Sequence, residues 1–471
     1  MNPSPPLRPT PPRPTRRELP PEFPGAARYA DEEVEAVSRV VRNRSPFRYY
    51  GPRFAGEVAA LEREFAQFLA SPHGRPWSDT SPLYVTAVNS GTGALEIALD
   101  ALGVGEGDEV LVQGFMWISS ISAIVRQRAI PVLIDSDDTL NLDPAEIRRR
   151  VGPRTRVVMP VPMLGGSARI GVLLETVREL NAERAQQGLP PVRVLEDCAQ
   201  ALGAHARGTP GSIHPTAPEG IHRLGTFGDV GIFSLQINKN ITAGEGGLVV
   251  TRDPLLARRI DALHNAGYAR GAGTPVNWYG DTPIGWGHGR RLGEIQGALA
   301  RIQLRRLDDI LQAMRSSHDR IESHLRSLGL RTRARADASH SGDTGYYCQF
   351  HLPESDEGEA DRIRRGRAVA GALGEFGLRP WFLHDFEVHV YYNIEPLVGR
   401  WPLNGGGPWR DTPVTQDPRH TYTRGTLPRL DRWLTSTIGI NVPSVLGPED
   451  EAYIRAVLDW VDATVIRASV R

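Results

Sequence analysis

The chain has 471 residues, of which 40% are apolar and 23% charged, enough to bury the cores of roughly two or three structural units. Lys and Arg number 55 and Asp and Glu also number 55, so the formal net charge is zero. Without excess positive charge, the sequence has no general electrostatic attraction to nucleic acid or to an anionic membrane. We expect neither as a partner.

Cysteine content and hydropathy indicate the cellular compartment of the protein. Cys198 and Cys348 lie far apart and belong to no CxxC motif, so we expect neither a disulfide framework nor a cysteine-based zinc site, and we predict no metal. The N-terminus lacks the apolar segment of a secretory signal, and no apolar run reaches the ~18 residues of a membrane span. A cytoplasmic location is expected.

Residues 1–28 are rich in proline and carry scattered arginines. They contain too few apolar side chains to offset the conformational entropy lost on ordering. We predict a disordered or extended arm that is mostly solvated, with a ligand for a proline-binding partner domain as the alternative.

Short β-branched runs alternate with helical patterns between residues 83 and 251. Strands are predicted at 83–88, 109–112, 130–134, 156–160 and 192–195, and helices at 92–102, 119–126 and 170–185. This alternation predicts an α/β fold, with a large domain whose mostly parallel sheet is flanked by helices.

Helical periodicity dominates from 254 to 328, and mixed segments follow. They include a predicted strand at 346–351, helices at 359–376 and 449–466, and a long irregular loop near 399–425. We therefore divide the chain into the arm (1–28), N-terminal helices with the large α/β domain (29–290), and linking helices with a smaller C-terminal α/β domain (291–471).

Three motifs follow predicted strands. The first, NSGTGA at 89–94, joins a strand to a helix, where backbone N–H groups and the helix dipole favour an anion and glycines let it approach. It lacks the third glycine of a dinucleotide fingerprint and is equally compatible with a structural tight turn. The second, EDCAQ at 196–200, places Asp197 at a strand's carboxyl end, where ligands bind in α/β folds.

The third motif, SLQINKN at 234–240, places Lys239 in an otherwise uncharged stretch before a glycine-rich turn. Taken singly, Asp197 and Lys239 are each compatible with an ordinary surface position. Together, a phosphate site, a carboxylate and a lysine at successive strand ends match the needs of pyridoxal phosphate (PLP).

At this point the sequence resembles the DegT/StrS family of PLP-dependent sugar aminotransferases (PLP fold type I) over about residues 30–466. The matching text is NSGTGALEIALDALGVGEGDEV, EDCAQALGA and GDVGIFSLQINKNITAGEGG. The resemblance implies that Lys239 and Asp197 are catalytic, Lys239 forming the covalent link to the cofactor and Asp197 facing the pyridine nitrogen. It also assigns the remaining cofactor contacts to Gly91, Thr92, Gly93 and Ser234 at the phosphate, Gln200 near the phenolic oxygen, and Trp117 stacked on the ring.

Chemistry supports these assignments. A carboxylate stabilises the protonated ring nitrogen, which draws electrons from the substrate carbon. Trp117 offers a broad flat face, although packing in the core is the alternative for this residue. Five further residues either line the substrate mouth or belong to ordinary packed loops: Arg48, Tyr49, Tyr50, His384 and His389.

The sequence departs from the family at two places. Family members usually carry, near Gly289, an Asn that reaches the phosphate of the neighbouring subunit. The resemblance implies a homodimer with shared active sites, so we predict that His288, Arg290 or Arg291 approaches the partner's phosphate site instead. The chain is also longer than usual, at the arm, around 209–223 and in the C-terminal part, where substrate specificity could reside.

The resulting hypothesis is a PLP-dependent aminotransferase that takes an amino group from Glu or Gln. Its acceptor is a keto-sugar, a nucleotide keto-sugar or a keto-cyclitol, in secondary-metabolite or surface-glycan biosynthesis. Alternatives are a dehydratase or oxidase of the same family, or a non-catalytic binding protein with this fold. The dehydratase branch has His in place of the lysine, so Lys239 favours transamination.

Overall fold

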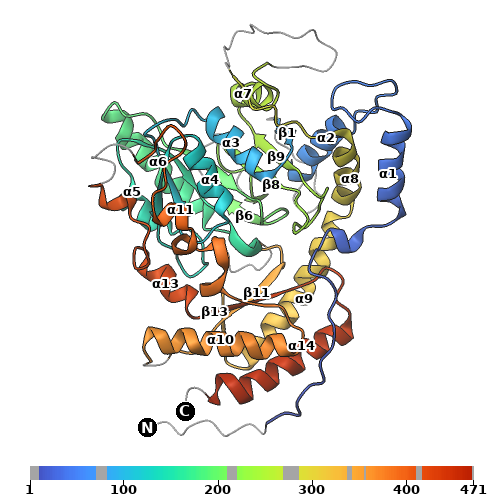
Figure 1. The fold of residues 1–471 in the computed structure, drawn as a ribbon, viewed down its shortest axis with the longest axis vertical. Helices are drawn as coiled ribbons and strands as arrows, with labels where there is room; N and C mark the ends of the chain where they lie inside the picture. The colour runs from blue at the N-terminus through green and yellow to red at the C-terminus, as the bar shows by residue number, and fades with distance from the viewer. Residues whose placement is uncertain are drawn as a thin grey trace.

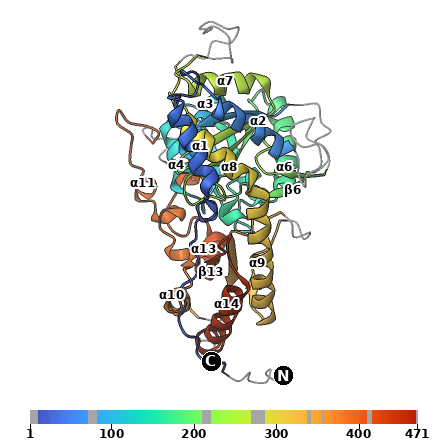
Figure 2. The ribbon, with the colours of Figure 1, turned by 90° about the vertical axis from the view of Figure 1, so that its right-hand side faces the viewer.

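The computed structural model describes residues 10–70, 82–208, 220–268, 286–336, 342–354, 357–409 and 416–468. A large sheet with its helices forms one end of the elongated molecule and a small sheet forms the other (Figures 1 and 2). Helix α9 (Leu307–Ser327) runs from the first end to the second. Among the described residues, every helix is too short or too polar to span a lipid bilayer.

The large sheet has seven strands in the order β1-β9-β8-β5-β4-β2-β3. Their bounds are Tyr84–Val88 (β1), Glu109–Gln113 (β2), Ile130–Ile134 (β3), Thr155–Met159 (β4), Arg193–Asp197 (β5), Val230–Ser234 (β8) and Gly247–Thr251 (β9). Strands β8, β5, β4, β2 and β3 pair in parallel, whereas β9 pairs antiparallel with both β1 and β8. The predicted mostly parallel α/β fold is confirmed.

Helices cover both faces of this sheet, which explains why its strands are nearly continuous apolar runs. They are α2 (Glu57–Ala70), α3 (Gly91–Ala101), α4 (Ile118–Arg126), α5 (Ile147–Arg150), α6 (Ile170–Gln186), α7 (Pro254–His264) and α8 (Glu294–Arg305). Helix α1 (Asp31–Arg42) packs on α8 instead. One buried cluster joins α3 and α4 to the sheet, and a second joins α2, α6 and α8 to its other face.

The small sheet is antiparallel, in the order β10-β11-β13-β12. Its strands are Arg331–Thr332 (β10), Tyr347–His351 (β11), Pro380–Phe382 (β12) and Thr437–Asn441 (β13). Helices α9, α10 (Glu359–Glu375) and α14 (Pro448–Val461) pack on it around a third core. A separate hairpin consists of β6 (His205–Gly208) and β7 (Gly220–Arg223).

A returning segment, described at residues 383–409 and 416–434, leaves the small sheet after β12 and re-enters it at β13. The sequence pattern assigns this segment to the small domain. In the structure it packs on the large domain. It contains two short helices, α11 (Glu395–Val398) and α13 (Pro428–Leu434). Tyr391, Tyr422 and Leu430 lie fully or almost fully buried in the large domain's core. Apolar spacing here follows neither helical nor strand periodicity, so the sequence pattern did not reveal this packing.

A buried ion cluster anchors the returning segment to the start of β2. Glu109 has no exposed side-chain surface and accepts hydrogen bonds from Arg419 at 2.8 and 3.0 Å and from Arg154 at 2.9 Å. Burial by itself would raise the pKa of Glu109, but hydrogen bonds from His420 and Arg419 outweigh it and lower the pKa to about 2. Arginine side chains occupy this cluster, so we interpret it as a structural anchor.

The N-terminal arm lies against the small domain. Residues 10–23 are extended, as one predicted form had it, but they lie along the small domain (dark blue in Figure 1). Arg17 pairs with Asp450 at 2.9 Å, and Leu19 packs against the third core. Most of residues 10–23 are exposed and none is buried, as a mostly solvated arm requires, but Leu19, Pro20 and Glu22 are partly covered by side chains of the small domain.

We expect Glu109→Gln to destabilise the fold by roughly 3 kcal/mol at neutral pH, because it leaves Arg419 without its buried partner. The native carboxyl has a pKa of about 2, below its ordinary 4.5, so its ionic contribution is present above about pH 4.5 and disappears as the pH falls toward 2. Thermal unfolding between pH 4.5 and pH 2 should show a smaller fall of the melting temperature in Glu109→Gln than in wild type. The control is Glu106→Gln, whose side chain is 65% exposed. Equal stability of Glu109→Gln and wild type would contradict the anchor.

Candidate functional site

A cavity of about 450 Å³ opens at the carboxyl ends of β1, β5 and β8. These strands run in the same direction, because β9 is antiparallel to both β1 and β8, and β5 is parallel to β8. Their carboxyl ends therefore meet at one edge of the sheet. Seven of the eight predicted site residues line this cavity: Gly91, Thr92, Trp117, Asp197, Gln200, Ser234 and Lys239. Gly93, in the first turn of α3, lies behind this wall.

The first turn of α3 forms one end of the cavity. Ser90 caps the helix, its Oγ accepting a hydrogen bond from the Gly93 N–H at 3.0 Å. A Cβ atom on Gly91 would lie only 2.9 Å from the Ser234 Cβ, so a side chain there would fill the gap between the two strand ends. Thr92 Oγ1 lies 2.8 Å from Ser119 Oγ. The result is a helix N-terminus flanked by hydroxyl groups and open to an anion.

Asp197 ends β5 and is 3% exposed. Ser120 Oγ donates to its Oδ2 at 2.7 Å and the Ala199 N–H donates to its Oδ1 at 3.2 Å. Burial raises the pKa of Asp197, and these hydrogen bonds and the Lys239 charge counter the rise only in part. A cationic group beside Asp197 would stabilise its ionised form. Ser120, at the start of α4, was not identified from the sequence because only the fold brings it to β5.

Lys239 lies in the loop between β8 and β9. Burial lowers the pKa of its amine, while the charges of Asp197 and Glu245 act in the opposite direction. A lowered amine pKa increases the neutral, nucleophilic fraction, as covalent catalysis by lysine requires. The backbone around it is held from outside the loop, since the Tyr346 hydroxyl donates to the Asn238 carbonyl at 2.7 Å.

An aromatic wall faces these polar groups. The Trp117 and His389 rings lie 4.7 Å apart, and His389 stacks on Phe386 at 4.0 Å between centroids. The Met116 N–H donates to the His389 carbonyl at 3.0 Å, which fixes the returning segment beside α4. Burial lowers the pKa of His389 to about 4, so its imidazole is neutral at physiological pH.

Among the five candidates for the substrate mouth, His389 lines the described cavity and the other four do not. Arg48 is buried and pairs with Glu62 at 2.5 Å, and the Tyr49 hydroxyl lies 2.9 Å from His264 Nε2. These contacts place Arg48 and Tyr49 in ordinary loop packing.

Gln200 is also held by the backbone. Its Oε1 accepts a hydrogen bond from the Leu164 N–H at 2.9 Å. Leu164 has a φ of +55°, in the left-handed region that branched side chains rarely adopt. This loop conformation thereby orients the Gln200 amide toward the cavity wall.

The basic residues at 288–291 have partners within the chain. His288 Nε2 lies 3.0 Å from Asp100 Oδ2, Arg290 pairs with Glu96, and Arg291 donates to the Asn265 amide oxygen at 3.0 Å. Gly289 has a φ of +65°, a conformation that Gly and Asn both tolerate, and a Cβ atom there would meet nothing within 4 Å. An approach to a partner's phosphate site stays a prediction.

Comparison with known proteins agrees with this arrangement. The model of the DegT/DnrJ/EryC1/StrS aminotransferase family matches residues 29–368. The chain belongs to this family. It is 32% identical to an L-glutamine:2-deoxy-scyllo-inosose aminotransferase of Streptomyces kanamyceticus, over 73% of this chain and 74% of that one.

Two solved structures share the fold. The 3-amino-5-hydroxybenzoic acid synthase superposes with a TM-score of 0.70 at 26% identity, covering 96% of this chain and 100% of the other. Spr1654 of Streptococcus pneumoniae, solved in a PLP form, has a TM-score of 0.69 at 20% identity over 93% and 97% of the two chains. The protein is a PLP-dependent aminotransferase, as its family membership shows.

The cavity residues fit this cofactor. The first turn of α3 and the Ser234 hydroxyl line the cavity together, and the α3 dipole and this hydroxyl favour the charge of a phosphate there. Burial raises the pKa of Asp197 more than its present partners lower it. A protonated pyridine nitrogen beside Asp197 would stabilise the ionised carboxylate.

Proposed function

We propose that this aminotransferase takes its amino group from glutamine and delivers it to an uncharged keto-cyclitol or keto-sugar. Lys239, Asp197 and the α3 turn line one cavity, and this arrangement supports amino-group transfer as the reaction type. The name of the Streptomyces kanamyceticus relative supports the donor and the acceptor class. Biosynthesis of an amino-cyclitol or amino-sugar secondary metabolite is the corresponding context.

We assign the roles as follows. Lys239 would hold the cofactor covalently, and its released Nζ would take up and return the proton of the substrate carbon. Asp197 keeps the ring nitrogen protonated, and Ser120 orients that carboxylate. The remaining contacts are the phosphate cradle of Gly91, Thr92, Gly93 and Ser234, the Gln200 amide at the phenolic oxygen, and the Trp117 face. Bound PLP supplies the electron sink for the reacting carbon.

The cavity wall supports an uncharged acceptor. Trp381, Phe386 and His389 present aromatic faces, which suit the C–H surfaces of a polyol ring, and the neutral His389 can hydrogen bond to a hydroxyl. Among the described residues that line the cavity, Lys239 is the only cationic side chain, and it is assigned to the covalent link with the cofactor. A nucleotide diphosphate would find no arginine to pair with on this wall. This observation favours the cyclitol or free sugar over a nucleotide-linked sugar.

Lys239→Ala should abolish turnover and the covalent cofactor link while leaving the fold intact, because the side chain lies at a cavity wall. Borohydride reduction of wild type followed by peptide mapping should place the pyridoxyl group on Lys239. A label on a different lysine would refute the assignment.

Asp197→Asn, a nearly isosteric change, should keep the covalent link between Lys239 and the cofactor but lose most of the aminotransferase activity.

The acceptor class is tested by offering 2-deoxy-scyllo-inosose, a free keto-hexose and a nucleotide-linked keto-sugar, each with glutamine or glutamate as donor. Mass spectrometry of the products should show amination of the cyclitol or the free sugar, with glutamine as the better donor. His389→Ala should raise the acceptor KM more than the glutamine KM. Preference for the nucleotide-linked acceptor would overturn the argument from the cavity wall.

We further propose a homodimer, whose interface includes the surface around residues 47–50. Phe47 and Tyr50 are exposed and contact each other at 4.8 Å between rings, and Arg291 lies over Phe47. Light scattering should show a dimer, and Tyr50→Asp should shift it toward monomer. The control, Tyr84→Asp, changes a tyrosine that is 37% exposed, against 62% for Tyr50, and should leave the dimer unchanged. A monomeric wild-type protein would contradict the hypothesis of active sites shared between two subunits.

A further inference from the structure

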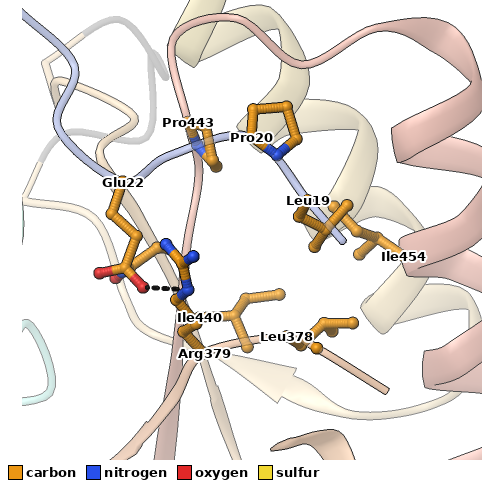
Figure 3. A pocket seen from close by; sticks show the side chains of 10 residues that line it. Leu19, Pro20, Glu22, Leu378, Arg379, Ile440, Pro443 and Ile454 are labelled. Atoms are coloured by element: carbon orange, nitrogen blue, oxygen red, sulfur yellow. Dashed lines mark ion pairs between the residues drawn. The ribbon is translucent and has the colours of Figure 1, made fainter. Parts of the chain in front are cut away.

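The N-terminal arm connects the small domain to the loop that carries Lys239. Figure 3 shows its docking, with Leu19 and Pro20 lying over Leu378, Ile440 and Ile454. Glu22 pairs with Arg379 at 3.3 Å in the same view. The family match begins at residue 29, so these contacts come from a segment outside the family's common part.

Further along the small domain, the arm is held by charge and by close packing. The Arg13 guanidinium lies 5.5 Å from the Trp460 ring. The Arg17 N–H donates to the Tyr453 hydroxyl at 3.0 Å. A Cβ atom on Gly377 would lie 2.6 Å from the Arg17 carbonyl oxygen, so the glycine allows the two backbones to touch. The arm is therefore docked along its described length rather than at one point.

Residues 24–29, here called the interdomain turn, follow the arm and lie between the two domains. On the small-domain side, Ser444 Oγ donates to the Pro24 carbonyl at 2.8 Å, and Arg28 donates to the Ser444 carbonyl. Ser444 is 1% exposed, so its bond to Pro24 forms away from solvent, while the bond from Arg28 is partly buried. The turn is thus fixed to the segment that follows β13.

On its other side the interdomain turn contacts the lysine loop, residues 235–246. The Gly25 N–H donates to the Lys239 carbonyl at 3.4 Å, and the Tyr29 hydroxyl donates to the Thr242 carbonyl at 3.1 Å. A Cβ atom on Gly25 would lie 2.8 Å from the Ile241 Cα, so no other residue permits this approach without a backbone shift.

We propose that the arm and the interdomain turn position the lysine loop, with Gly25 and Tyr29 as positioning residues. Docking of Leu19 and Glu22 on the small domain holds the turn, and the turn holds the backbone of Lys239 where the cofactor link forms. The inference rests on the proposed role of Lys239. It gives residues 10–28, which precede the family match, and Tyr29, its first residue, a part in positioning the lysine, and it connects the small domain to the lysine loop.

Hydrogen–deuterium exchange of the apoprotein tests the contact without reference to activity. Gly25→Ala should speed exchange of amides in residues 235–246 by about tenfold, while β4 and β2 stay protected. Tyr29→Phe should act in the same direction but more weakly, because water can replace a hydroxyl on a partly exposed ring. The control, Gly105→Ala, adds a Cβ that would meet nothing within 4 Å and should change nothing.

Leu19→Asp tests the connection to the small domain, since it undocks the arm far from Lys239. We expect faster exchange in the lysine loop and PLP binding weakened several-fold, about three- to tenfold by titration. The matched control is Leu255→Asp, on an exposed leucine of α7. Restoring the apolar contact with Leu19→Met should restore both readouts.

Two results would overturn the inference. One is an unchanged exchange rate in the lysine loop for both Gly25→Ala and Leu19→Asp. The other is equally faster exchange throughout the chain, which would show a general loss of stability. Failure of wild type to bind PLP would instead refute the proposed function, because the exchange measurement uses the apoprotein and remains readable.

Discussion

The electrostatic interaction between Lys239 and Asp197 is the one on which the rest of the site depends. Burial favours the neutral form of each group, raising the carboxyl pKa and lowering the amine pKa, while their mutual attraction opposes both shifts. Such a pair is retained only when the surrounding structure holds both backbones firmly. Ser120 does this for the carboxylate, and the contacts of the lysine loop do it for the amine.

The large sheet supplies the common edge on which these groups meet. Because β1, β5 and β8 run in the same direction, the α3 turn, Asp197 and Ser234 emerge side by side although more than a hundred residues separate the first from the last. The antiparallel strand β9 has a second effect. It returns the chain between β8 and β1, so the lysine loop between β8 and β9 must turn back at this edge.

Two segments cross between the domains: the returning segment lines the cavity, and the arm with the interdomain turn contacts the lysine loop from outside it. The returning segment carries Phe386 and His389 to the face opposite Asp197, anchored at its far end by the Glu109 ion cluster. The arm and the interdomain turn approach the lysine loop from the small-domain side. The aromatic wall of the cavity and the outer contacts of the lysine loop therefore come from parts of the chain that lie outside the parallel sheet.

The sequence by itself determined the α/β fold and the groups of Lys239, Asp197 and the α3 turn, because strand–helix alternation and short motifs at strand ends are local signals. Tertiary structure alone decided that Ser120 supports Asp197, that the returning segment packs on the large domain, and that the arm is docked. These contacts join residues distant in the chain, such as Tyr422 with Pro131 and Gly25 with Lys239. Their apolar and polar side chains follow no period, so their partners are set by the folded surfaces and not by neighbouring residues.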